Sequence, residues 1–198
     1  MIRNYFLLIF SFYLLPVTHA QDYSQESCEK DFEQFWNLVD QHFAYFHTQK
    51  TDWRKVKYLY KPKLKTVDSP SEFVEFMEKV IAELYNGHVS LGSNTASSPR
   101  LVPSGSDFWV ERIEGKYIIQ AVREGGRAKK AGMEVGMEVL AFQDESIFKL
   151  VGENCPESFY NYDTEVYRYV ANVLLAGTRD RARKIVCRTV EGKNVLFE

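Results

Sequence analysis

The chain has 198 residues, and its 25 Lys and Arg against 27 Asp and Glu give a formal net charge of −2. This balance excludes a protein that binds nucleic acid through an overall positive charge. With 45% hydrophobic and 26% charged residues, the composition is typical of a globular chain and excludes a disordered one.

The N-terminus predicts a secretory signal peptide. Arg3 precedes an apolar run from Tyr5 to Leu15, which Pro16 and the small residue Ala20 follow. This order matches the charged, apolar and cleavage regions of a signal peptide. The run is also shorter than the about 20 residues that a helix needs to cross a membrane. We therefore expect residues 1–20 to be removed and the protein to be exported to the periplasm or the extracellular space, without a membrane anchor.

Three helices are predicted in the first half of the mature chain. Apolar and aromatic residues recur every three or four positions from Ser27 to about His47, which indicates the first helix. A second helix spans about Asp52 to Tyr60, because Pro62 should end or kink it there. The third begins at the capping box Ser69-Pro70-Ser71-Glu72 and stops before Gly87, which we expect to adopt a left-handed conformation.

A change of composition marks a boundary after these helices. Residues 92–106 are rich in Gly, Ser, Asn and Pro, which predicts a linker. We therefore assign residues 21–91 to a helical cap domain and residues 107–198 to a second domain.

The second domain is predicted to mix strands and helices. Phe108–Val110 and Tyr117–Ile119 flank a turn at Gly115, which indicates a hairpin. The order of the elements indicates an α+β fold. The remaining elements are a helical turn at Ala128–Ala131, a strand at Val135–Phe142, a long helix at Tyr160–Leu175 that Gly177 ends, and strands at Lys184–Val190 and Asn194–Phe197.

Cysteines and cationic residues give no sign of a cofactor site. In an oxidising compartment Cys155 and Cys187 could pair, but three separate thiols, with Cys28, fit the sequence at least as well. The spacing of the cysteines matches neither a zinc site nor a redox pair, and we expect no metal or other cofactor. A basic run at residues 179–184 is interpreted as a solvated loop.

The segment between the predicted hairpin and the long helix carries a motif with two spaced glycines. It reads Ala128-Lys129-Lys130-Ala131-Gly132-Met133-Glu134-Val135-Gly136-Met137-Glu138-Val139-Leu140-Ala141-Phe142. The run resembles the Ala-x-x-Ala-Gly-Leu-x-x-Gly-Asp-x-Ile-x-x-Ile signature of PDZ domains in bacterial proteases, with Met137 in place of the usual aspartate. The resemblance implies a small PDZ-like β-sandwich or barrel with two helices.

A second motif, Leu84-Tyr85-Asn86-Gly87-His88-Val89-Ser90-Leu91, follows the third predicted helix. It is similar to the Leu-x-Asp-Gly-His-x-x-Leu element of tail-specific, or C-terminal-processing, serine peptidases of the tricorn-like branch, with Asn86 in place of the aspartate. The aromatic first helix and Thr51-Asp52-Trp53 are similar to the same region. A three-helix cap followed by a PDZ-like domain is the order of that family.

The resemblance also implies what this chain lacks. In that family the nucleophilic serine lies in an α/β core domain that follows the PDZ-like domain, whereas this chain stops at Glu198. We therefore expect the catalytic core to be absent and the chain alone to be inactive, because a serine hydroxyl needs an adjacent base. The resemblance makes His88 the candidate general base, acting only when a core domain supplies the serine. On general grounds, a lone histidine at the exit of a helix is more often structural.

A PDZ-like domain implies that the partners are the C-termini of peptides or unfolded proteins. Such a domain adds the peptide to a sheet edge as a strand and holds its carboxylate on backbone amides. Gly105, Ser106, Asp107 and Phe108 precede the first predicted strand and are the expected carboxylate loop, with a plain linker as the alternative. The chain is thus interpreted as part of an exported serine-type endopeptidase, with a non-catalytic secreted peptide-binding module or a truncated gene product as alternatives.

Overall fold

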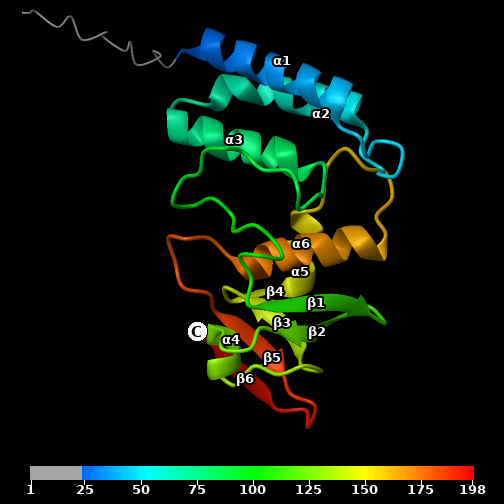
Figure 1. The fold of residues 1–198 in the computed structure, drawn as a ribbon, viewed down its shortest axis with the longest axis vertical. Coiled ribbons are helices and arrows are strands. Elements are labelled where there is room, and N and C mark those ends of the chain that lie inside the picture. Colours follow the sequence, from blue (N-terminus) through cyan, green and yellow to red (C-terminus); the bar gives the residue numbers. More distant parts are fainter. Residues whose placement is uncertain (1–23) are drawn as a thin grey trace, which may run out of the picture.

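The structure is a computed structural model, and it describes residues 24–198. The predicted signal peptide, residues 1–20, lies outside the described residues. Helices occupy the first half of the described chain and an antiparallel sheet with further helices occupies the second (Figure 1). This arrangement confirms the α+β class. Across residues 24–198, no helix combines the length and the apolar character needed to cross a membrane.

The first half forms a layer of helices, of which the second and third begin where the sequence predicts and the first begins two residues earlier. The Asp52 carboxylate accepts a hydrogen bond from the Lys55 N–H (3.0 Å), and the Ser69 hydroxyl accepts one from the Glu72 N–H (3.3 Å). Asp52 and the predicted cap Ser69 therefore satisfy donors in the first turn of a helix. The layer consists of α1 (Gln25–His42), α2 (Trp53–Tyr60), the 3-10 helix η1 (Lys61–Thr66) and α3 (Pro70–Ala82).

The first helix ends five residues earlier than predicted. Phe43 leaves the helical conformation, and the chain from there to His47 forms turns. The Phe43 and Phe46 rings nevertheless meet with their centroids 4.9 Å apart, and Phe46 reaches the ring of Trp53. The aromatic periodicity therefore continues beyond α1 because a turn, and not a helix, places these rings on the core.

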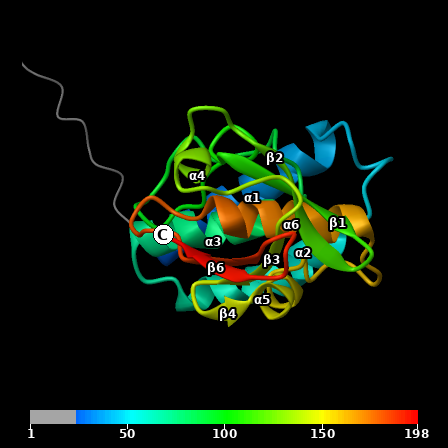
Figure 2. The ribbon, with the colours of Figure 1, turned by 90° about the horizontal axis from the view of Figure 1, so that it is seen from below.

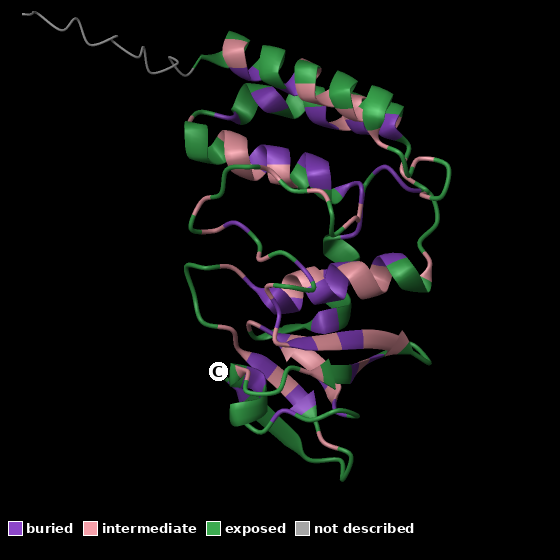
Figure 3. Ribbon diagram, in the orientation of Figure 1, coloured by how far each residue is buried: buried purple, intermediate pink, exposed green. Residues whose placement is uncertain are grey.

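The helices enclose a core of aromatic and aliphatic side chains. Trp36 and Trp53 lock α1 to the start of α2, since each indole N–H donates to the backbone carbonyl of the other residue (2.9 and 3.0 Å). Figure 3 shows the buried residues of this layer on the sides of the helices that face one another. The core comprises Cys28, Phe32, Trp53, Val56, Tyr60, Leu64, Val67, Phe76, Met77, Val80 and Leu84.

Gly87 does not adopt the predicted left-handed conformation. After α3 the positive φ occurs at Tyr85 instead, with a value of 35°. Gly87 is required for a different reason, because a Cβ atom there would lie only 2.7 Å from the Val102 carbonyl oxygen. The glycine thus permits a close approach of two backbone segments.

The second half is built on an antiparallel sheet with the strand order β1-β2-β3-β5-β6, and β4 pairs with β3. The predicted hairpin is confirmed: its turn residues Glu114 and Gly115 have φ of 49° and 80°, as the tight turns that suit twisted hairpins require. The strands are β1 (Phe108–Ile113), β2 (Lys116–Val122), β3 (Glu138–Phe142), β4 (Glu145–Ser146), β5 (Ile185–Arg188) and β6 (Asn194–Phe197).

Three helices accompany the sheet. The predicted helical turn is present as α4 (Arg127–Lys130). The predicted long helix is present as α6 (Thr164–Ala176), which begins four residues later than predicted and which Gly177 ends as expected. The seven-residue helix α5 (Ile147–Glu153) was not predicted, because it spans only two turns; Ile147 and Val151 are buried in the core and Leu150 packs against it. Figure 2 shows α6 crossing the sheet region, with the helical layer behind it.

A second core lies between the sheet and α6. Cys155 and Cys187 belong to it as free thiols and form no disulfide. Burial raises the pKa of Cys155 to about 11 and that of Cys187 to about 12, so both thiols stay protonated at neutral pH. Their core neighbours include Val110, Tyr117, Ile119, Val139, Ile147, Val151, Val166, Leu175 and Ile185.

The segment predicted to be a linker, residues 92–106, is fastened along the sheet domain. Pro99 forms an isolated bridge with Thr178, and the Arg100 N–H donates to the Gly177 carbonyl (2.9 Å). The Arg179 N–H donates in turn to the Ala96 carbonyl (3.2 Å). These bonds bring the segment before β1 alongside the loop that follows α6.

Candidate functional site

The predicted peptide-binding loop leads directly into β1. Three of its four backbone amides are already hydrogen-bonded within the chain. The Gly105 N–H donates to Leu101 O (2.6 Å), the Ser106 N–H to Pro103 O (3.2 Å) and the Phe108 N–H to Ser106 Oγ (3.5 Å). In this conformation the loop does not present a cluster of free N–H groups to a carboxylate.

Asp107 gives the loop a different role. Its Oδ1 accepts a hydrogen bond from Arg183 Nη2 (2.8 Å), and its Oδ2 accepts one from the Ala128 N–H (2.7 Å). Burial alone would raise the pKa of Asp107, but the hydrogen bonds from Arg183 and Ala128 outweigh it and lower that pKa. The ionised carboxylate therefore ties the loop to α4 and fixes Arg183, whose side chain is only 16% exposed.

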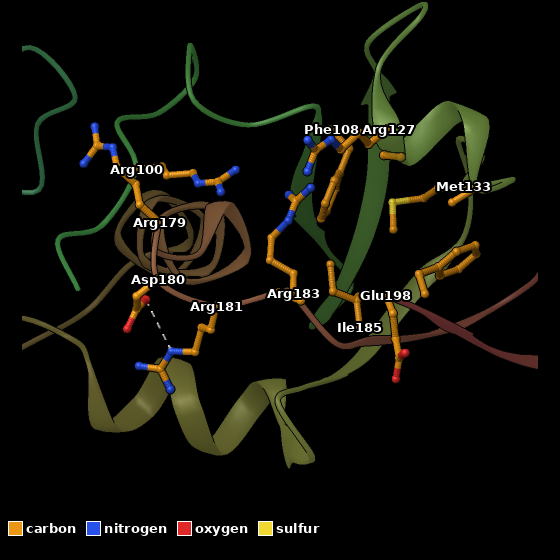
Figure 4. A pocket seen from close by; sticks show the side chains of 14 residues that line it. Arg100, Phe108, Arg127, Met133, Arg179, Asp180, Arg181, Arg183, Ile185 and Glu198 are labelled. Carbon is orange, nitrogen blue, oxygen red and sulfur yellow. Dashed lines mark ion pairs between the residues drawn. The ribbon is translucent and has the colours of Figure 1, made fainter. Parts of the chain in front are cut away.

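Arg183 is one of five arginines around a cavity of about 410 Å³. The segment before β1, the start of α4 and the loop between α6 and β5 supply these side chains (Figure 4). Five cations line the cavity against two carboxylates, and Asp107 behind the lining neutralises Arg183, so an excess of positive charge remains and the cavity is suited to an anion. The arginines are Arg100, Arg127, Arg179, Arg181 and Arg183, and the carboxylates are Asp180 and Glu198.

Three of the five arginines contact a neighbouring group. Arg183 pairs with Asp107, the Arg100 Nε donates to Thr178 O (3.1 Å), and Arg181 Nε lies 3.8 Å from Asp180 Oδ1. Arg127 and Arg179 form no side-chain hydrogen bond or ion pair within the described chain. Their exposed guanidinium groups are free to bind a ligand.

The cavity also has an apolar wall. Phe108, Met133, Ile185 and Phe197 line it, and all four are buried. Cationic groups beside an apolar surface suit an organic anion that carries a hydrophobic group. The terminal carboxylate and last side chain of a peptide form such a ligand.

The basic run at residues 179–184 is a loop as predicted, with Arg179 and Arg181 exposed, but the side chain of Arg183 is only 16% exposed. Docking of residues 92–106 brings Arg100 beside this run, and the ion pair with Asp107 turns Arg183 inward. These contacts join residues more than 70 positions apart, so the run itself carried no local signal of a cavity.

His88 lies apart from this cavity. It is exposed and occupies the loop after α3, where its N–H donates to Asn86 Oδ1 (2.9 Å). Asn86 thus supplies the acceptor that an aspartate would supply at the same position.

Within residues 24–198, no group of three or more His, Cys, Asp and Glu side chains is placed to hold a metal ion.

Comparisons with known proteins agree with the predicted resemblance. Residues 24–82 match the family model of the Tricorn protease C1 domain, which corresponds to the helical layer. The fold is similar to that of mature CPAF, with 12% sequence identity, a TM-score of 0.55 and coverage of 87% of this chain and 34% of the other. Mature CPAF complexed with lactacystin gives 13% identity, a TM-score of 0.55 and the same coverage. No curated protein matches the sequence.

The family match confirms the resemblance to tricorn-like proteases in the helical layer, and the structural matches show that most of the chain shares the fold of CPAF. The chain spans about a third of the length of the solved structures that it resembles.

Proposed function

We propose that this chain is the N-terminal, substrate-recognising part of an exported serine-type endopeptidase of the tail-specific, tricorn-like kind. The family match and the shared fold support a protease-family function. Since the chain spans about a third of its structural relatives, a separate α/β core would supply the catalytic serine. A non-catalytic, secreted peptide-binding module is the second candidate, because the cavity needs no catalytic domain in order to bind a ligand.

The arginine-lined cavity is the observation that carries the peptide-recognition part of this proposal. The free guanidinium groups of Arg127 and Arg179 supply charge-assisted hydrogen bonds to a terminal carboxylate. Phe108, Met133 and Ile185 receive the apolar side chain of the last residue. The carboxylate would then lie beside the predicted loop at residues 105–108 and be held by cations instead of the amides of that loop.

Arg127→Gln is expected to weaken the binding of peptides with a free C-terminus by about tenfold, because it removes an unpaired cation from the cavity. Calorimetric titration should also show that amidating the peptide C-terminus lowers its affinity by a similar factor. Arg54→Gln makes the same change at an exposed position of α2 and should leave binding unchanged. Equal affinities for free-acid and amidated peptides would rule out the carboxylate site.

We also propose that His88 is the general base of the complete peptidase. Its exposed position after α3 allows it to face a domain that packs on this surface. In a protein that joins this chain to a serine-bearing core, His88→Ala should lower kcat by a factor on the order of 10² to 10³. His47→Ala, also exposed, is the control. Unchanged kcat in His88→Ala would remove the assignment.

A further inference from the structure

A PDZ domain accepts a peptide as an added strand at a sheet edge, and the edge of β1 is one such place in this sheet. β1 is an outer strand of the sheet and pairs on one side with β2. Ile119, opposite Val110, donates its N–H to Met137 O (2.9 Å) and accepts a hydrogen bond from the Gly136 N–H (2.9 Å). Ile119 therefore does not bond Val110, and the N–H and C=O groups of Val110 point to the outer edge.

A side chain of α6 already occupies these two groups. Asn172 Oδ1 accepts a hydrogen bond from the Val110 N–H (2.9 Å), and Asn172 Nδ2 donates to Val110 O (2.9 Å). The Nδ2 group also donates to Arg168 O (2.8 Å), so both of its hydrogens are used. Asn172 is 1% exposed and Val110 is fully buried. The side-chain amide thus pairs with Val110 as a neighbouring strand would.

The backbone groups of Phe108, the next residue toward the start of β1 whose N–H and C=O point to the outer edge, are hydrogen-bonded as well. Phe108 lies two residues before Val110, and Ser106 Oγ donates to Phe108 O (2.7 Å) and accepts from the Phe108 N–H (3.5 Å). A peptide strand in this groove would have to replace both sets of bonds.

Further contacts hold α6 along β1. Arg168 Nη1 lies 3.4 Å from Glu111 Oε2, and the Arg112 guanidinium lies 4.1 Å from the centre of the Tyr167 ring. Entry of a strand between β1 and α6 would therefore disturb an ion pair and a cation–π contact in addition to the Asn172 bonds.

We propose that Asn172 closes β1 against strand addition, so that a peptide whose carboxylate lies in the arginine-lined cavity does not extend along β1. This inference rests on the proposed function and narrows its ligand to the terminal carboxylate and the last residue or two, held in the arginine-lined cavity. Residues farther from the peptide terminus do not pair with β1, and affinity does not increase with peptide length.

A length series of free-acid peptides tests this inference. Peptides of about three, five and eight residues that share their last three residues should bind the wild-type protein with dissociation constants within about threefold of one another. Asn172→Ala exposes the Val110 groups, and its affinity should rise about tenfold from the shortest to the longest peptide. Asn161→Ala, in the exposed loop before α6, should behave as the wild type.

The outcomes separate this inference from the proposed function. A wild-type affinity that rises tenfold or more with peptide length overturns the closure of β1 while leaving the carboxylate site intact. Equal affinity for free-acid and amidated peptides at every length overturns the proposed function, and this inference falls with it. If Asn172→Ala does not fold, the wild-type series still decides. The wild-type Val110 amide should also exchange its hydrogen equally slowly with and without the longest peptide.

Discussion

Replacing Glu83 with alanine is expected to lower the free energy of unfolding by about 3 kcal/mol, because three buried or half-buried donors lose their acceptor. Glu83 follows α3 and is 2% exposed. Its Oε1 accepts hydrogen bonds from the Tyr60 hydroxyl (2.8 Å) and the Glu157 N–H (2.9 Å), and its Oε2 accepts one from the Ser158 N–H (2.9 Å). The carboxylate therefore joins the helical layer to the loop between α5 and α6.

Glu83→Gln tests the acceptor role without changing the size of the side chain. The glutamine NH₂ group would face either the Ser158 N–H or the Tyr60 hydroxyl and the Glu157 N–H. We expect the free energy of unfolding to fall by about 2 kcal/mol. In urea unfolding of this variant, the transitions measured by tryptophan fluorescence and by far-UV circular dichroism should no longer coincide, because Glu83 joins the helical layer to the sheet domain. Glu153→Gln, at the exposed end of α5, is the matched control. Equal stability of the two variants would contradict this role of Glu83.

Features set by neighbouring residues were predictable from the sequence. Ser69 and Glu72 lie three positions apart, and a cap bonds residues at that spacing whatever the rest of the fold does. Glu114 and Gly115 likewise specify a tight hairpin turn between two apolar runs. In both cases the atoms that determine the conformation lie within one turn of chain.

The candidate site depends on contacts that no local pattern encodes. Asn172 bonds Val110 from 62 positions away, and Asp107 pairs with Arg183 across 76. In the sequence Asn172 is one polar residue within an amphipathic helix, and Arg183 is one cation in a basic run. Only the packing of α6 against β1 and the docking of residues 92–106 give these side chains their roles.

Asp107→Ala is expected to lower the free energy of unfolding by about 3 kcal/mol at neutral pH, because it leaves a largely buried cation without its partner. Arg183 would lose its ion pair, and the Ala128 N–H at the start of α4 would lose its acceptor. Peptide affinity should fall as well, since the arginine that Asp107 holds lines the cavity.

The pH dependence of this variant separates the charge of Asp107 from its packing. The pKa of Asp107 is lowered in the folded protein, so its ionised form stabilises the fold above the ordinary aspartate pKa of about 3.9. That stabilisation decreases as the pH falls toward the lowered pKa, because the folded state must then bind a proton that its contacts disfavour. Urea unfolding should show a smaller difference between wild type and Asp107→Ala at about pH 3 than at pH 7. Asp31→Ala, at an exposed position of α1, controls for the loss of any carboxylate. A difference of the same size at both pH values would mean that Asp107 acts through packing and not through its ion pair with Arg183.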